Sequence, residues 1–243
     1  MKPSPGYERV SRGAGGKRRA FLTRVLGALS GTFLAAVLAA AAPQPCNDPM
    51  LLVDTPDPLT FDRICADSIA AMRAVTICGI SQDAAILVKP VDHVELPIGP
   101  GLAAFDCRVN SISILWPDIM QSRIGPDDPY SRLSKEALFR SVLTHEMAHA
   151  LLHQTGKGCP IPLVDHEYVA NALELAALTP EDRTALVEAS NIDWSPSADV
   201  ISAGIYFIAP RKFAVAAWRY HDLQGCDPIR GIVAGTYSFE KER

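Results

Sequence analysis

The 243-residue sequence lacks the features of a multi-span membrane protein and of a nucleic-acid-binding protein. After residue 42 it has no apolar run of the ~20 residues that a membrane span needs. Positive charge is also scarce there, because residues 43–243 hold 16 Lys and Arg against 26 Asp and Glu, a net charge of −10. So acidic a chain offers no electrostatic footprint for nucleic acid or for an anionic membrane surface. Disorder is excluded as well, since 48% hydrophobic residues are enough to build a core.

The first 42 residues have the layout of an export signal. Seven of the first 24 residues are basic and only Glu8 is acidic, and an alanine-rich apolar run follows over Val25–Ala42. The small residues Ala39 and Ala41 suit cleavage after about residue 41. We therefore expect residues 1–42 to be removed and the mature protein to be periplasmic or secreted.

Two other interpretations of this leader stay open. The run Lys17-Arg18-Arg19 before Phe21-Leu22 resembles the twin-arginine export signal, although Lys17 stands where that signal has Ser or Thr. The 18 residues Val25–Ala42 also reach the lower edge of a membrane span. Contact with a membrane is expected only if the leader remains uncleaved.

Six cysteines lie beyond the leader, and none of them belongs to a CxxC pair. The missing pairs argue against a thiol redox motif and against a thiolate zinc site. An even number of cysteines in an exported chain predicts disulfides, with 15 possible pairings that the sequence does not distinguish. The six residues are Cys46, Cys65, Cys78, Cys107, Cys159 and Cys226.

Strand patterns come early and helix patterns late in residues 43–243, without βαβ alternation or an internal repeat. Residues 43–60 are rich in proline and are expected to form an extended lead-in, followed by a single domain over 61–243. Short aliphatic runs predict strands at 85–89, 104–109 and 111–116. Helical spacing and start signals predict helices at 61–77, 134–154 and 165–178, one beginning at Thr179-Pro180 and one after Pro210. Loops are expected at 96–101 and 117–130. This order predicts an α+β fold.

The motif that carries chemistry is His145-Glu146-Met147-Ala148-His149, within the helix predicted at 134–154. Four residues apart, His145 and His149 share one helix face about 6 Å apart along the axis, so both imidazoles can bind one zinc ion at about 2.1 Å. Glu146 points about 100° away and can act on a water beside the ion. The alternative is an ordinary amphipathic helix. It is disfavoured because apolar neighbours predict a partly buried helix, in which two imidazoles and a carboxylate need partners.

A catalytic zinc site needs a third protein ligand, and three candidates follow in the sequence. Glu167, 18 residues after His149, is our first choice, with Asp165 and His166 as alternatives. His153 lies about 12 Å along the helix from His145, too far to share the ion, and is expected to be a cation at the helix end.

This arrangement resembles the gluzincin metallopeptidases, in which HExxH on one helix is completed by a Glu that opens a following helix. The resemblance covers about residues 112–178. A third His in the pattern HExxHxxGxxH is absent, since Leu152 and Thr155 stand at those positions, so the metzincin pattern is not met. The resemblance implies a zincin-like fold: a small N-terminal β-sheet, the active-site helix and a C-terminal helical part. It also implies that the strand at 111–116 is the edge strand that binds substrate.

The resemblance further implies an exported zinc peptidase that hydrolyses peptide bonds in a peptide or protein substrate. Glu146 is then the general base that acts on a zinc-activated water, and His145, His149 and Glu167 are the metal ligands. The alternative function is a non-catalytic, zincin-like periplasmic binding or structural protein. No oxyanion stabiliser is assigned, because each candidate also has an ordinary role in a core or at a surface. Those candidates are Tyr168, Tyr206, Tyr220, His221 and Arg211.

Overall fold

A five-stranded mixed sheet forms one side of the molecule in the computed structural model, which describes residues 42–96, 99–155, 161–193, 195 and 197–240. The strand order is β1 (Gln44–Pro45), β2 (Leu51–Val53), β3 (Ile86–Val91), β7 (Ser111–Leu115) and β6 (Ala103–Asp106). Strands β2, β3 and β7 are parallel, and β1 and β6 are antiparallel edge strands. A separate ribbon pairs β4 (Glu95–Leu96) with β5 (Gly99–Pro100). The leader predicted at 1–42 lies almost entirely outside the described residues.

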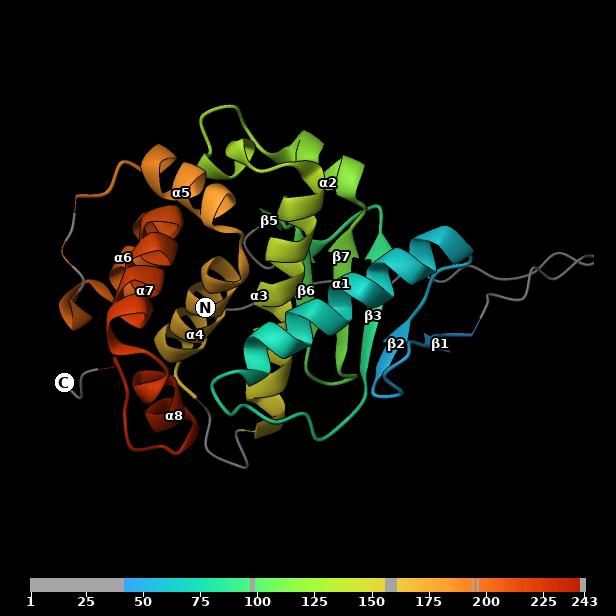
Figure 1. Ribbon diagram of the computed structural model, residues 1–243, viewed down its shortest axis with the longest axis horizontal. Helices are drawn as coiled ribbons and strands as arrows, with labels where there is room; N and C mark the ends of the chain where they lie inside the picture. The colour runs from blue at the N-terminus through green and yellow to red at the C-terminus, as the bar shows by residue number, and fades with distance from the viewer. Residues whose placement is uncertain (1–41, 97–98, 156–160, 194, 196, 241–243) are drawn as a thin grey trace, which may run out of the picture. The chain divides into compact units, whose positions relative to one another are not determined.

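Most other elements are helices. Figure 1 shows α3 in the middle, with the sheet and α1 on one side of it and the later helices on the other. Helix α3 packs against α1, α4 and the strands β6 and β7. The α+β class is therefore confirmed. The helices are α1 (Pro58–Thr76), α2 (Pro117–Arg123), α3 (Lys135–Thr155), α4 (Leu163–Ala177), α5 (Pro180–Ala189), α6 (Ala203–Ile208), α7 (Pro210–Gln224) and α8 (Asp227–Val233).

Local sequence explains where these elements begin. Asp57 caps α1 by accepting the Thr60 backbone N–H, and Pro58 occupies the first turn, where its missing N–H costs nothing. In β3 the side chains alternate strictly between buried and half-buried, as a strand with one face against a core requires. Helix α3 has buried residues around most of its circumference because it is enclosed by its neighbours.

Three predictions need correction. Residues 117–130 are not all loop, because Pro117 and Asp118 start α2 as a proline and an acid in a first helical turn do. The segment 43–60 is more than a lead-in, since β2 sits inside the sheet with Leu51 and Val53 fully buried. The strand at 111–116 is not an edge strand, because β7 lies between β3 and β6. The edge beside α3 is β6.

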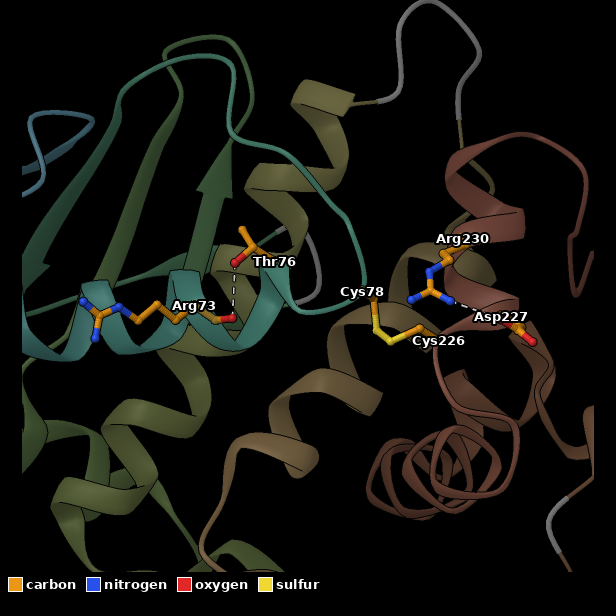
Figure 2. The surroundings of a disulfide bond; sticks show 6 residues. All are labelled: Arg73, Thr76, Cys78, Cys226, Asp227 and Arg230. Carbon is orange, nitrogen blue, oxygen red and sulfur yellow. Dashed lines mark hydrogen bonds and ion pairs between the residues drawn. A yellow bond between two sulfur atoms is a disulfide. The ribbon is translucent and has the colours of Figure 1, made fainter.

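Two disulfides join distant parts of the chain. Cys46, just after β1, is bonded to Cys65 in α1, and Cys78, just after α1, is bonded to Cys226 between α7 and α8. Figure 2 shows the second bond beside the Arg230–Asp227 ion pair at the start of α8. Cys107 is exposed and unbridged in the part of the chain that the structure describes, and Cys159 lies outside it. The prediction of disulfides is therefore confirmed for four of the six cysteines.

No helix within the described residues has the length and apolar character needed to cross a membrane.

Candidate metal centre

The two histidines of the HExxH motif converge from adjacent turns of α3. Their Nε2 atoms lie 3.1 Å apart, with the imidazole rings nearly perpendicular at a centroid distance of 4.7 Å. Both side chains are mostly buried, with exposed fractions of 20% for His145 and 18% for His149. The helical spacing therefore produces the pair of nitrogen donors that it predicts.

Glu167, in the second turn of α4, completes a group of three ligand atoms. Its Oε2 lies 3.6 Å from Nε2 of His145, and its Oε1 lies 3.7 Å from Nε2 of His149. Two donors at about 2.1 Å from one ion in tetrahedral geometry lie about 3.4 Å apart, which is close to all three separations. One ligand atom from each of the three residues falls within 4.8 Å of the other two. Two imidazoles and a carboxylate at these distances are a set of donors that could hold a metal ion.

The two alternative third ligands lie elsewhere. Asp165 is buried with its carboxylate turned to the C-terminal segment, where it accepts hydrogen bonds from Ser238 Oγ at 2.6 Å and from the Phe239 backbone N–H at 2.7 Å. The His166 ring stands 5.7 Å from that of His149 and is not one of the three clustered residues. Glu167, the first choice from the sequence, is the acid that α4 places beside the histidine pair.

Glu174, two turns further along α4, holds His145 from behind. Its Oε2 accepts a hydrogen bond from Nδ1 of His145 at 2.9 Å, and its Oε1 accepts from Tyr130 at 2.7 Å and from Ser141 at 2.5 Å. With Nδ1 occupied, Nε2 of His145 is left to face Glu167, as in the carboxylate–histidine pairs that orient metal ligands. Glu174 is not among the site residues predicted from the sequence. Its spacing of seven residues from Glu167, two helical turns, was the available signal.

The charges around the cluster perturb both histidines. Burial opposes a charge on His145, but the hydrogen bond and the charge of Glu174, together with the charges of Glu167 and Glu146, raise its pKa to about 9. Burial, together with the positive charge of the neighbouring His145, lowers the pKa of His149 well below its ordinary value. At neutral pH the lowered pKa leaves His149 neutral, whereas His145 would have to release a proton before its Nε2 could bind a metal ion.

Glu146 lies on the side of α3 that faces β6. Burial raises the pKa of its carboxyl to about 7, against the opposing charge of His145 and a hydrogen bond from the Phe105 backbone N–H. A pocket of about 140 Å³ adjoins it, lined by nine residues of five segments. They are Leu102, Ala103, Tyr130, Val142, His145, Glu146, Asn171, Glu174 and Arg211. A carboxylate with a pKa near neutrality beside a pocket suits a group that both takes and returns a proton.

Of the five residues considered as oxyanion stabilisers, Tyr206 of α6 reaches the cluster. Its hydroxyl donates a hydrogen bond to Glu167, and burial and the charges of Glu167 and Glu146 raise its pKa. Tyr168 and Tyr220 pack instead on Phe239. Arg211 lines the neighbouring pocket. No local sequence pattern distinguishes Tyr206 from the other four candidates, because α6 approaches the site only through the tertiary fold.

A comparison with protein families gives one match. The model of DUF6639, described as a family of unknown function, covers residues 51–242. The chain belongs to this family. The DUF6639 match includes every residue of the candidate metal centre, from Tyr130 to Arg211. No curated protein and no solved structure matches the chain.

Proposed function

We propose that this DUF6639 member is an exported zinc-dependent peptidase with a zincin-like fold. The observation that carries the proposal is the convergence of ligand atoms of His145, His149 and Glu167 within 4.8 Å, with the half-buried Glu146 on the same helix as the histidines. A small sheet with an antiparallel edge strand beside the HExxH helix, followed by a helical part, also suits a zincin-like arrangement.

Each residue then has a defined task. His145, His149 and Glu167 hold the ion, and Glu174 fixes the orientation of His145. When bound, zinc supplies a Lewis acid that polarises a peptide carbonyl and makes a nearby water more acidic. Glu146 accepts a proton from the attacking water and returns it to the leaving amine. Tyr206, whose hydroxyl lies beside Glu167, stabilises negative charge on the carbonyl oxygen.

The position of β6 supports a peptide as substrate. Among the described residues this strand pairs only with β7, so its outer edge can pair with an extended peptide in the manner of an added strand. The backbone N–H of Phe105 in β6 is hydrogen-bonded to Glu146, so the edge and the general base are adjacent. A peptide on this edge has its backbone beside the proposed metal site.

Export to the periplasm or the medium is supported by the two disulfides, since such bonds form and persist in oxidising compartments.

The deciding experiment combines metal analysis with one conservative substitution. We expect the purified protein to contain one zinc ion per chain and His145→Ala to lose it. Glu146→Gln should keep the zinc and lower peptide hydrolysis about 100-fold or more, because it removes only the general base. Glu136→Gln, a half-exposed acid in the first turn of the same helix, is the matched control and should match the wild type.

Two results would overturn the proposal. Absence of zinc from the wild-type protein would refute the proposed metal site. An unchanged hydrolysis rate in zinc-loaded Glu146→Gln would refute the assignment of Glu146 as general base and favour a binding or structural role.

A further inference from the structure

The pocket beside Glu146 contains a guanidinium whose orientation is fixed. Arg211 donates from Nε at 3.2 Å and from Nη2 at 3.1 Å to the same oxygen, Oδ2 of Asp128. The other oxygen of Asp128 accepts the Tyr130 backbone N–H at 2.9 Å, so the carboxylate itself is held. The guanidinium also lies over the Tyr130 ring, 4.0 Å from its centroid. Arg211 therefore cannot swing away from the pocket wall without losing three contacts.

One edge of this guanidinium is uncommitted. Within the described residues Nη1 of Arg211 has no hydrogen-bond acceptor, and Asp128, which holds the other two nitrogens, does not line the pocket. The acid opposite, Glu174, has both oxygens engaged by His145, Tyr130 and Ser141. A fixed guanidinium with a free N–H edge is a donor suited to a carboxylate.

Size and position limit what enters. At about 140 Å³ the pocket is below half of the ~300 Å³ at which pockets for drug-sized ligands begin, so it takes about one small residue. Because Glu146 must reach the leaving amine, the pocket next to Glu146 receives the residue that carries this amine. That residue is the one directly after the cleaved bond.

We infer that this pocket binds a carboxylate of the substrate through Arg211, so that the protein prefers peptides whose residue after the cleaved bond is anionic. The inference rests on the proposed peptidase function. The carboxylate has two possible sources, a free C-terminus on a small residue or the side chain of Asp or Glu. Release of a single C-terminal residue follows from the first source and cleavage before an internal acid from the second.

The test uses two matched pairs of peptide pools of mixed sequence and needs no variant. One pair ends in alanine as the free acid or as the amide, and the other is amidated and carries Asp or Asn at one internal position. We expect the wild-type kcat/KM to be about 10- to 100-fold higher for the anionic member of at least one pair, which is the value of one hydrogen bond between charged groups. A preference in the first pair identifies the C-terminus, and one in the second identifies the side chain. Equal rates within both pairs overturn the inference.

The zinc-loaded Glu146→Gln protein gives a second readout, because it binds peptides without turning them over. We expect the same preference in equilibrium dissociation constants by calorimetry, and its loss on adding Arg211→Gln, with the ratio falling below about threefold. Arg211→Lys keeps the charge if the Gln variant fails to fold, and should retain part of the preference. Lys212→Gln, the adjacent cation outside the pocket lining, is the matched control and should keep it in full.

The outcomes separate the two proposals. Hydrolysis without a preference for anionic substrates would support the peptidase function and refute carboxylate binding by Arg211. An anionic preference in binding without hydrolysis of any pool removes the peptidase and leaves the carboxylate pocket.

Discussion

Glu174 shows how much of the candidate site depends on one residue that touches no ion. Its carboxylate joins His145 on α3 to Tyr130 and Ser141, and only 3% of its surface is exposed. Replacement by Gln keeps the shape and removes the charge that fixes the His145 tautomer. We expect Glu174→Gln to weaken zinc binding about 10- to 100-fold, the usual effect of losing such a partner. Competition with a chelating dye measures this. The exposed Glu188→Gln on α5 is the control, and an unaltered zinc affinity in Glu174→Gln would contradict the assignment.

The pKa of Glu146 sets a pH dependence. Burial raises this pKa to about 7, and only the ionised carboxylate can accept a proton. The value of kcat/KM should therefore be highest above pH 7 and fall about tenfold for each pH unit below it. Measurement of kcat/KM between pH 5 and 9, at pH values where the zinc content is constant, tests this decrease. A flat profile across this range shows that Glu146 is not the base.

For individual site residues, the sequence predicts the positions that a single helix determines and few of those that depend on packing between helices. The convergence of His145 and His149 follows from helical spacing alone. The approach of Glu167 depends on how α3 and α4 pack, which the resemblance to gluzincins implied and composition did not. Tyr206 and Arg211 come from α6 and α7, more than 35 residues after Glu167, and no local pattern connects them to the motif.

Among the elements, α3 is tied to the sheet by its last turn as well as by its apolar surface. The side-chain amide of Gln154 accepts the backbone N–H groups of Asp83 at 2.8 Å and Ala84 at 3.0 Å, and donates to the Ala84 carbonyl at 3.1 Å and to Asn110 at 3.2 Å. The helix that carries the histidines thus joins the segment before β3 to the turn before β7. Its position relative to β6 depends on this junction.

Gln154→Ala should lower the free energy of unfolding by about 1 kcal/mol, because it removes hydrogen bonds to backbone groups that water can then reach. Urea unfolding measures the change. Gln224→Ala, at an exposed position in the last turn of α7, is the control and should differ from wild type by less than about 0.5 kcal/mol. An equally small change in Gln154→Ala would show that the junction does not support α3.

Long elements with a repeated pattern were predictable, and short ones were not. The sequence predicts α1, α3 and α4 within a few residues of both ends and α7 at its start, because each repeats its apolar spacing over several turns. Strand β2 has three residues and follows a proline-rich stretch, so its apolar residues form no period. That β6 rather than β7 is the edge depends on strand order, which is a property of the sheet and not of either strand's sequence.

In the molecule as a whole, the two disulfides close loops of very different length. Cys46 and Cys65 are 19 residues apart, and Cys78 and Cys226 are 148 apart. A cross-link stabilises by restricting the unfolded chain, so the longer loop has the larger effect, about 5 kcal/mol against about 3 kcal/mol. Urea unfolding of the double variants Cys78→Ala/Cys226→Ala and Cys46→Ala/Cys65→Ala should show this order. The reverse order would mean that strain or residual structure dominates.

The bond between Cys78 and Cys226 also bears on how the protein matures. His145, His149 and Glu167 all lie within the segment that it closes, so α3 and α4 belong to one covalent ring before any ion arrives. An oxidised, metal-free chain then keeps the three proposed ligands close together. Zinc binding becomes a late step that needs no refolding. Chelation and resupply of zinc should be fully reversible in the oxidised protein, and slower or incomplete once this bond is reduced.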